Sequence, residues 1–195
     1  MPERDPKKFD PARAHLLDAP ERERYLPTAK LVELLALDGG ETVVDYGAGT
    51  GRAAVALAPA LPRGRVIAVD ESDEMLEHLR GRLDGLANAS AVRIAGNRLD
   101  MDPGGADRVL AVNLLHEVRG ERALAEMRRL VSPDGFVLVV DWERGRERAT
   151  GPPDELLYSI EEAALELADS AFSVESVDAG LPYHFALIAR PKEAP

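Results

Sequence analysis

The sequence predicts an α/β fold, with a doubly wound, seven-stranded, mostly parallel sheet that ends in an antiparallel C-terminal hairpin. Short apolar runs alternate with amphipathic segments along most of the 195 residues. This alternation is typical of a parallel sheet with helices on both faces. The last two apolar runs, at 172–179 and 183–190, are joined only by residues 180–182, too short a link for a crossover helix. They are therefore expected to pair antiparallel.

The remaining elements follow in order from the apolar patterning. Parallel strands are expected at the short apolar runs 41–46, 65–70, 91–95, 107–113 and 136–141. Helices are expected where apolar residues recur at helical spacing, at 28–37, 51–60, after Ser72, at 117–131 and from Ser159 to about 169. Ser159 and Glu162 have the spacing of a capping box. The run SPDG at 132–135 is typical of a turn.

Composition indicates one domain with a small N-terminal appendage. Residues 1–24 are polar and contain four prolines, so we expect 1–26 to form an N-terminal cap or tail and 27–195 to form the main domain. The net charge of −11 disfavours nucleic acid and anionic membranes as partners. The absence of cysteine excludes disulfides and thiolate chemistry. No apolar run is long enough to span a membrane, and the charged start lacks a signal-peptide core, so we expect a cytoplasmic protein.

The stretch VVDYGAGTGRAAVALA, residues 43–58, combines a strand, a glycine-rich turn and a helix. This order is typical of a nucleotide-binding βα unit, because glycines allow a ligand to approach the backbone closely. Asp70 ends the next apolar run, 19 residues after Gly51. That spacing suits a carboxylate that accepts hydrogen bonds from a ribose.

The details of the glycine turn distinguish two cofactor classes. A dinucleotide fingerprint needs a small residue at the position of Arg52. The turn fits the pattern D-x-G-x-G-x-G instead, with Asp45 two residues before Gly47. This pattern resembles motif I of the class I S-adenosylmethionine-dependent methyltransferases, whose acidic residue faces the amino acid half of the cofactor. A carboxylate suits the ammonium there, whereas it would repel a pyrophosphate.

Later stretches strengthen this resemblance, which covers most of residues 27–190. VIAVDESDEML, AGNRLD, DRVLAVNLLHEV and LVSPDGFVLVVDW resemble the second to fifth motifs of the family. The resemblance implies a Rossmann-like fold and a site for S-adenosylmethionine, with S-adenosylhomocysteine as product. The implied cofactor-binding residues are Asp45, Gly47, Ala48, Gly49, Gly51, Asp70, Glu71, Met75, Asn97, Arg98, Asn113 and Leu114. The C-terminal pattern resembles a small-molecule subgroup related to the ubiquinone-biosynthesis methyltransferases.

The expected function is therefore methyl transfer by in-line displacement to a small-molecule acceptor. Two alternatives remain open. The first is a non-catalytic S-adenosylmethionine-binding sensor or subunit, because methyl transfer requires little beyond alignment of acceptor and cofactor. The second is a nicotinamide-dependent oxidoreductase, against which Arg52 and the lack of a Tyr-x-x-x-Lys pair both argue. The acceptor atom and the oligomeric state are left open.

Catalytic and acceptor-binding residues are expected after the fourth and fifth parallel strands, since ligands of α/β folds bind at the carboxyl edge of the sheet. His116 is a candidate general base or acceptor contact, with a structural imidazole as the alternative. Glu143 is a second catalytic candidate, or else a solvated acid. Trp142 and Tyr25 are candidates for walls of the acceptor pocket. HEVRG at 116–120 lacks the second histidine of a zinc motif, so no metal is expected.

Overall fold

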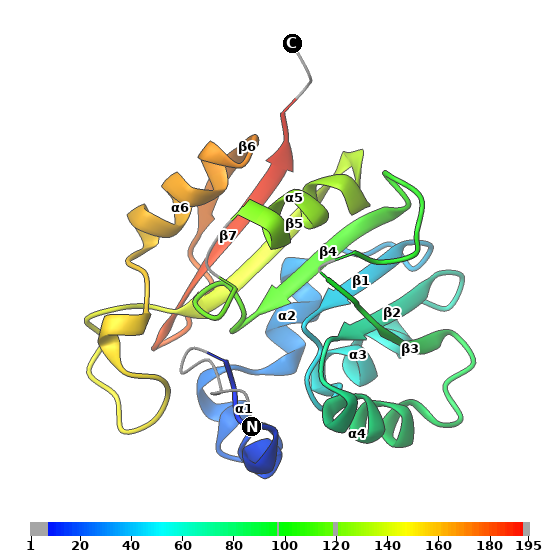
Figure 1. The fold of residues 1–195 in the computed structure, drawn as a ribbon, viewed down its shortest axis with the longest axis horizontal. Helices are drawn as coiled ribbons and strands as arrows, with labels where there is room; N and C mark the ends of the chain where they lie inside the picture. The colour runs from blue at the N-terminus through cyan, green and yellow to red at the C-terminus, as the bar shows by residue number, and fades with distance from the viewer. Residues whose placement is uncertain (1–7, 97, 119–120, 193–195) are drawn as a thin grey trace.

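The computed structural model describes residues 8–96, 98–118 and 121–192. Its centre is a seven-stranded sheet of order β3-β2-β1-β4-β5-β7-β6, which Figure 1 shows between two layers of helices. Only β7 runs antiparallel to its neighbours, β5 and β6. The strands are β1 Thr42–Tyr46, β2 Arg65–Asp70, β3 Ala89–Arg93, β4 Ala106–Val112, β5 Val131–Trp142, β6 Phe172–Val177 and β7 His184–Pro191. The predicted fold class is confirmed.

Helices cover both faces of the sheet. The α-helices are α1 Arg22–Tyr25, α2 Thr28–Leu34, α3 Arg52–Leu57, α4 Asp73–Leu83, α5 Glu121–Leu130 and α6 Ile160–Asp169. Three short 3-10 helices, η1 Pro11–Leu16, η2 Ala58–Ala60 and η3 Asp154–Leu156, complete the described elements. Helices α5 and α6 contribute buried side chains to one core cluster, and α2, α3 and α4 contribute to the other. No helix in the described ranges is both long and apolar enough to cross a membrane.

The apolar runs become central strands because their side chains alternate between the two cores. Val44 and Val109 belong to the core beneath α5 and α6, whereas Val43 and Leu110 belong to the core on the opposite face. All four are completely buried. A strand buried on both faces needs an unbroken apolar run, which is the pattern that the sequence showed.

Two local predictions had different outcomes. The predicted capping box is present, since the Ser159 and Glu162 side chains each accept from the other's backbone N–H. The predicted turn at 132–135 is wrong, because β5 already begins at Val131, which pairs with Ala106. The register between β4 and β5 shifts between Ala106 and Arg108, so residues 132–135 form an irregularity within the strand pairing.

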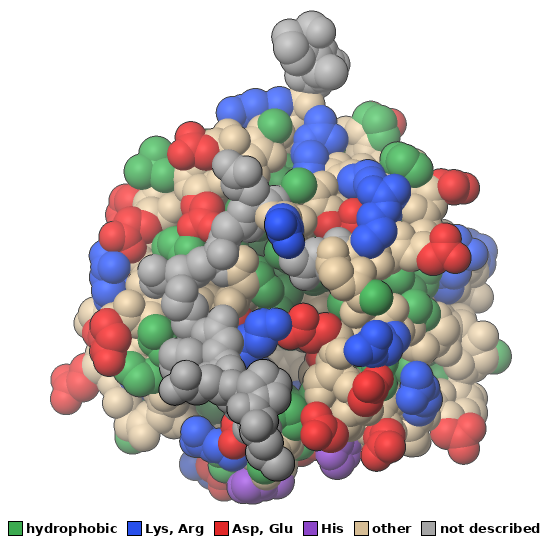
Figure 2. All heavy atoms as spheres, in the orientation of Figure 1, with side chains coloured by type: hydrophobic (Ala, Val, Ile, Leu, Met, Phe, Trp, Pro, Cys, Tyr) green, Lys and Arg blue, Asp and Glu red, His purple; other side chains and the backbone are tan. Residues whose placement is uncertain are grey.

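The N-terminal segment lies across the carboxyl ends of the parallel strands. In Figure 1 the blue η1 and α1 lie directly below the ends of β1 and β4. Within residues 8–26, only Ala14 and Leu26 are buried. Acidic and basic side chains are interspersed over the face shown in Figure 2. The segment therefore covers an edge of the sheet without adding much to the core.

Candidate cofactor and acceptor site

A cavity of about 1040 Å³ lies between the carboxyl edge of the sheet and the N-terminal segment. Its walls come from the glycine turn after β1, the end of β2, the residues after β4 and β5, and residues 8–28. Parallel strands place their carboxyl ends at one edge, and this is where α/β folds bind ligands. The cavity thus lies where the sequence motifs led us to expect a site.

The glycine turn is shaped by contacts that exclude a Cβ atom. Gly47 and Gly51 have φ angles of 77° and 87°, in the left-handed region that favours glycine. A Cβ on Gly47 would lie 2.8 Å from Leu114 Cδ1, and one on Gly51 would lie 2.4 Å from Leu79 Cδ1. Gly47 therefore allows the chain after β4 to approach the turn, whereas Gly51 allows α4 to pack beneath it.

Asp45 carries a buried carboxylate at the end of β1. Its side chain borders the cavity, and its Oδ2 atom has no hydrogen-bond partner among the residues that the structure describes. Burial, and secondarily the nearby Asp70, raises the pKa of Asp45 to about 7. A buried oxygen without a partner costs free energy unless a ligand satisfies it. A cationic donor such as an ammonium group would satisfy this oxygen.

Asp70 joins the end of β2 to the glycine turn. Gly49 N–H donates to Asp70 Oδ2 (2.8 Å), and Ser72 N–H donates to Oδ1 (2.9 Å). Burial raises the pKa of Asp70, although these two hydrogen bonds oppose the shift. Each carboxylate oxygen retains a further lone pair, so the fixed side chain can also accept from the hydroxyls of a ribose.

Asn113 follows β4 in a left-handed conformation, with a φ angle of 53°. With its amide oriented to match its neighbours, the side-chain oxygen accepts from Arg22 Nη2 (2.8 Å) and from Trp142 Nε1 (3.3 Å). Its NH₂ group then donates to His184 Nε2 (3.2 Å). Asparagine tolerates this backbone better than most residues, and its amide links the N-terminal segment to β5 and β7.

His116 is held by Asp141, which belongs to the end of β5. His116 Nδ1 lies 2.7 Å from Asp141 Oδ1, and the His116 backbone N–H donates to Oδ2 (3.1 Å). The carboxylate therefore favours the tautomer with hydrogen on Nδ1, which leaves the acceptor lone pair on Nε2. Because His116 lines the cavity, this arrangement suits a general base.

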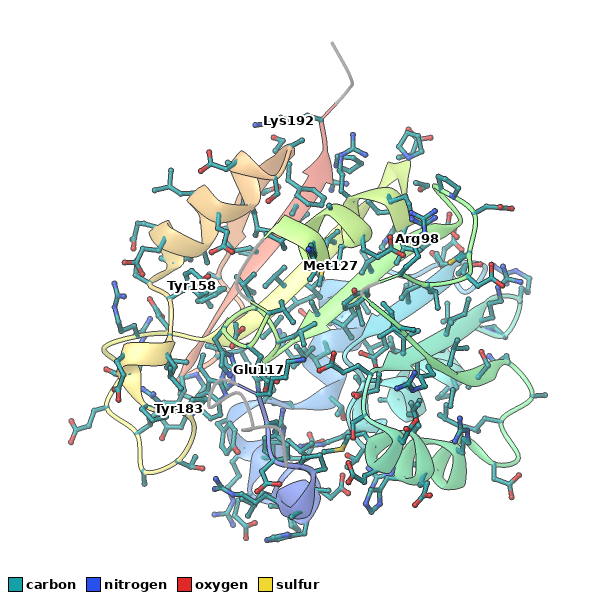
Figure 3. The ribbon with its side chains drawn as sticks, in the orientation of Figure 1. Arg98, Glu117, Met127, Tyr158, Tyr183 and Lys192 are labelled. Carbon is teal, nitrogen blue, oxygen red and sulfur yellow. The ribbon has the colours of Figure 1, made fainter. Side chains whose placement is uncertain are left out.

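Glu117 is a second titratable group on this wall. Its Oε1 lies 3.9 Å from His116 Nε2, and its Oε2 accepts from the Phe9 backbone N–H (3.2 Å). Burial raises the pKa of Glu117 to about 7, against the opposing effect of His116. Figure 3 shows Glu117 beside the N-terminal segment, far from Arg98. Glu117 therefore connects the acceptor side of the cavity to its cover.

Tyr25 and Trp142 line another part of the cavity and belong to an aromatic cluster with His184 and Tyr183, which lie behind the wall. The Trp142 ring lies 4.2 Å from His184 and 5.5 Å from Tyr25, measured between ring centroids. Tyr183, labelled in Figure 3, lies 5.8 Å from Tyr25 in the same way. Burial lowers the pKa of His184 to about 3, so its ring is neutral and packs as an aromatic group. This wall suits a flat, largely apolar ligand.

The structure brings most of the predicted site residues to this cavity. The residues that line it are Asp45, Gly47, Ala48, Gly49, Asp70, Glu71, Met75, Asn113 and Leu114, together with Tyr25, His116 and Trp142. Asn97 lies outside the described residues. These positions stay proposals as binding residues, but they share one enclosed space.

Three predicted residues lie elsewhere. Gly51 is absent from the cavity wall because its role is to admit Leu79. Arg98 Nη1 lies 3.9 Å from Oε2 of Glu126 in α5, and Arg98 does not line the cavity. Glu143 pairs with Arg146 (2.6 Å) instead of facing an acceptor. The two arginine–carboxylate attractions explain why the last two side chains turn away.

Sequence reasoning missed many contributors to the wall, among them Glu117, Arg22 and Leu17. Glu117 had one available signal, its position next to His116. Arg22 and Leu17 lie in a polar segment without an apolar period, and only the folded chain brings them to the cavity. Arg148, in the loop after β5, has a buried side chain over the Trp142 ring, 5.6 Å from its centroid.

Comparisons with known proteins find similar methyltransferases. Residues 43–135 match a family described as a methyltransferase domain. The ubiquinone/menaquinone biosynthesis C-methyltransferase UbiE of Bordetella avium is 40% identical over 109 residues, 54% of this chain and 42% of that protein. The trans-aconitate 2-methyltransferase of Methylobacterium radiotolerans is 38% identical over 71 residues, 36% of this chain and 27% of that protein. The aligned regions thus span less than half of either relative.

Solved structures extend the similarity to most of the chain. A S-adenosylmethionine-dependent methyltransferase from Aquifex aeolicus has a TM-score of 0.86 and 29% identity, with 93% of this chain and 98% of that chain covered. A methyltransferase from Haloferax volcanii, solved with its activator Trm112, has a TM-score of 0.77 at 20% identity, which shows the fold alone. It covers 98% of this chain and 100% of that chain.

The fold and the cavity define an α/β domain built to bind S-adenosylmethionine. Three observations on this chain fit the cofactor: the buried unpartnered oxygen of Asp45, the glycine turn that a Cβ would obstruct, and the fixed carboxylate of Asp70. Residues 43–135 match the methyltransferase domain family, and the chain as a whole has the fold of an S-adenosylmethionine-dependent methyltransferase.

Proposed function

We propose that this protein transfers a methyl group from S-adenosylmethionine to a small organic acceptor. One observation carries the proposal: a single cavity is bordered both by the glycine turn with Asp70 and by His116, Tyr25 and Trp142. The first set suits the cofactor and the second suits an acceptor. A shared cavity allows the two reactants to be aligned, which is the main requirement for this displacement.

The cofactor is held by groups whose chemistry matches its parts. Asp45 binds the ammonium of the methionine portion, and Asp70 accepts from the ribose hydroxyls. Glu71 and Met75 border the ribose and adenine, whereas Asn113 borders the methionine portion. All five residues line the cavity.

The acceptor reacts beside His116. When bound, S-adenosylmethionine supplies a methyl group attached to a sulfonium sulfur, and loss of this methyl group leaves a neutral thioether. The acceptor atom forms the new bond to carbon, and its proton passes to His116 Nε2. Asp141 keeps the other ring nitrogen protonated and stabilises the imidazolium that forms. The aromatic wall and the N-terminal segment exclude water from this step.

The acceptor is a small molecule, because the cavity has a limited volume of about 1040 Å³ and the chain is acidic. Two similar proteins carry names that point the same way, one to ubiquinone and menaquinone biosynthesis and one to trans-aconitate. The aromatic wall favours a planar acceptor such as a phenol or a quinol. The net charge of −11 argues against nucleic acid as the acceptor.

Titration calorimetry tests the cofactor assignment. The protein should bind S-adenosylmethionine and S-adenosylhomocysteine but neither NAD nor NADP. Asp70→Ala should weaken binding by about 1.5–3 kcal/mol, the loss of charge-assisted hydrogen bonds to two hydroxyls. Asp73→Ala is the matched control, since Asp73 is an exposed acid three residues away that pairs with Arg93. Nicotinamide binding without S-adenosylmethionine binding would contradict the proposal.

Turnover is a separate measurement. Formation of S-adenosylhomocysteine should be followed with a panel of phenols, quinols and polycarboxylates as acceptors. Cofactor binding with no turnover on any member of the panel would favour a sensor or subunit over an enzyme.

A further inference from the structure

Arg22, the first residue of α1, places a cation against the cavity without a carboxylate partner. Burial lowers the pKa of its guanidinium, which borders the cavity. Its two acidic neighbours are engaged elsewhere. Asp18 pairs with Arg82 (2.7 Å) and accepts from Thr50 (2.8 Å), and Glu23 pairs with Arg52 and with Thr28. Within residues 8–96, 98–118 and 121–192, Arg22 forms no ion pair.

The hydrogen bond that Arg22 makes goes to a neutral group. In the amide orientation described above, Asn113 accepts from Arg22 Nη2 at 2.8 Å. A guanidinium carries five N–H donors in a planar fork, so this bond uses only part of its capacity. Among the described residues no carboxylate forms an ion pair with this charge, and Asp18 and Glu23 attract it only through space. Buried arginines are usually paired, because an isolated charge in a low-dielectric site is unfavourable.

Other cations at the cavity differ in this respect. Lys8 pairs with Glu71, Arg52 with Glu23, and Arg93 with Asp73 (2.9 Å). Arg13 is exposed to solvent, which hydrates its charge. Arg22 is therefore the cavity-lining cation that is both partly buried and without an ion-paired carboxylate in the part of the chain that the structure describes.

We propose that Arg22 binds a carboxylate of a ligand in this cavity. The guanidinium fork matches a carboxylate with two parallel hydrogen bonds, and Asn113 fixes its orientation. This inference rests on the proposed function, under which two ligands share the cavity. The carboxylate belongs either to the methionine portion of the cofactor, opposite Asp45 and its ammonium, or to the acceptor at the aromatic wall.

Calorimetry with two nucleosides tests the cofactor as the source. S-Adenosylhomocysteine carries the amino acid carboxylate, whereas 5′-methylthioadenosine lacks it. If Arg22 binds this carboxylate, Arg22→Met should weaken S-adenosylhomocysteine binding at least about tenfold, the loss of one charged hydrogen-bonded pair, and leave methylthioadenosine binding unchanged. Arg24→Met is the matched control, because Arg24 is an exposed residue of the same helix.

A second arm tests the acceptor as the source. Protein saturated with S-adenosylhomocysteine is titrated with benzoate, and with benzyl alcohol as its uncharged match. If the acceptor supplies the carboxylate, Arg22→Met leaves S-adenosylhomocysteine affinity unchanged and abolishes the preference for benzoate over benzyl alcohol. Circular dichroism and thermal unfolding establish that each variant is folded. If Arg22→Met does not fold, Arg22→Lys replaces it. This variant keeps the charge but lacks the planar fork, so it should show a partial loss of affinity in the same experiment.

The outcomes separate the two proposals. If the parent protein does not bind S-adenosylhomocysteine, the proposed function fails. If the parent binds it, and the folded Arg22 variants bind it and benzoate as the parent does, the carboxylate assignment of Arg22 is overturned while the methyltransferase proposal stands.

Discussion

The two sides of the cavity are built by different forces. We call the floor the residues at the carboxyl ends of the parallel strands, 45–51, 70–72, 113–117 and 141–142, and the roof residues 8–26. The floor follows directly from strands that are hydrogen-bonded to neighbours on both sides, as β1 is between β2 and β4. Its central acids are almost completely buried, with 2% of Asp45 and 1% of Asp141 exposed. The floor is therefore as rigid as the sheet.

The roof is attached mainly through side chains. Its contacts with the rest of the site include Lys8 with Glu71, Phe9 with Glu117, and Asp18 with Thr50. The Lys8 and Glu71 side chains are 44% and 53% exposed, and such pairs contribute little because water and salt screen them. The roof is therefore held by fewer backbone hydrogen bonds than the floor. Under the proposed function, the floor would set the cofactor geometry and the roof would enclose the acceptor.

The largest effect that we expect comes from the acceptor end of the floor. His116→Ala removes the proposed base. Methyl transfer to an acceptor that must lose a proton should therefore fall on the order of 10²–10⁴-fold, the usual contribution of a positioned base. S-Adenosylhomocysteine affinity should stay within about twofold of the parent, because a missing acceptor base leaves cofactor contacts in place. Steady-state kinetics and calorimetry measure the two quantities.

His78→Ala provides the control for this substitution, since His78 is an exposed histidine on α4. If His116→Ala transfers methyl groups at the parental rate, His116 is a structural imidazole, and the floor contributes alignment without acid–base chemistry.

A truncated roof tests the comparison from the other side. Deleting residues 1–17 removes η1 together with Lys8 and Phe9, which contact Glu71 and Glu117, but keeps Asp18 and Arg22. We expect methyl transfer to fall on the order of a hundredfold, as for misplaced reactants, with the thermal midpoint and cofactor affinity nearly unchanged. A truncated protein with parental turnover would show that the floor alone encloses the acceptor.

The sequence predicted the floor far better than the roof, for a physical reason. Asp45 and Gly47 lie in a local strand–turn–helix pattern, and Asp70 and Asn113 end apolar strands, so short-range patterning places all four. The contact between Phe9 and Glu117 joins residues 108 positions apart, and no local pattern encodes it. The same limit applies to the pairing of His116 with Asp141, although both residues were expected at the carboxyl edge.

Glycine substitutions sharpen the account of the floor. Gly51→Ala combines a left-handed backbone with a Cβ placed 2.4 Å from Leu79 Cδ1, whereas Gly85, at a φ angle of 82°, has no atom near its Cβ position. Gly51→Ala should lower the free energy of unfolding by about 2–3 kcal/mol, combining backbone strain with overpacking. Gly85→Ala should lower it by about 1 kcal/mol from strain alone. Chemical denaturation measures both, and equal losses would show that the packing against α4 yields freely.

The smallest effect that we expect is a pH dependence of cofactor binding that originates in the floor. Burial raises the pKa of Asp45 to about 7, so its carboxyl group is largely neutral at pH 6 and ionised at pH 8. The ligand ammonium favours the ionised form, and binding therefore releases a proton while the pH lies below about 7. By linkage, S-adenosylhomocysteine affinity should rise with pH by at most about tenfold per unit below that value and level off above it.

Asp45→Asn isolates this group, because the amide keeps the shape of the side chain and does not titrate. Its affinity should be weaker than that of the parent at pH 7.5 and nearly flat between pH 6 and 7.5.

In the protein without ligand, the raised pKa of Asp45 makes folding stability fall with rising pH, the direction opposite to that of ligand affinity. Folding stability linked to Asp45 is fully present below its unfolded pKa and is lost as the pH rises through about 7. Calorimetry across this range, with methylthioadenosine as the ligand without an ammonium, decides the matter. If Asp45→Asn shows the same pH profile as the parent, Asp45 does not contact the ligand ammonium. The strongest link between the floor and the cofactor would then be lost.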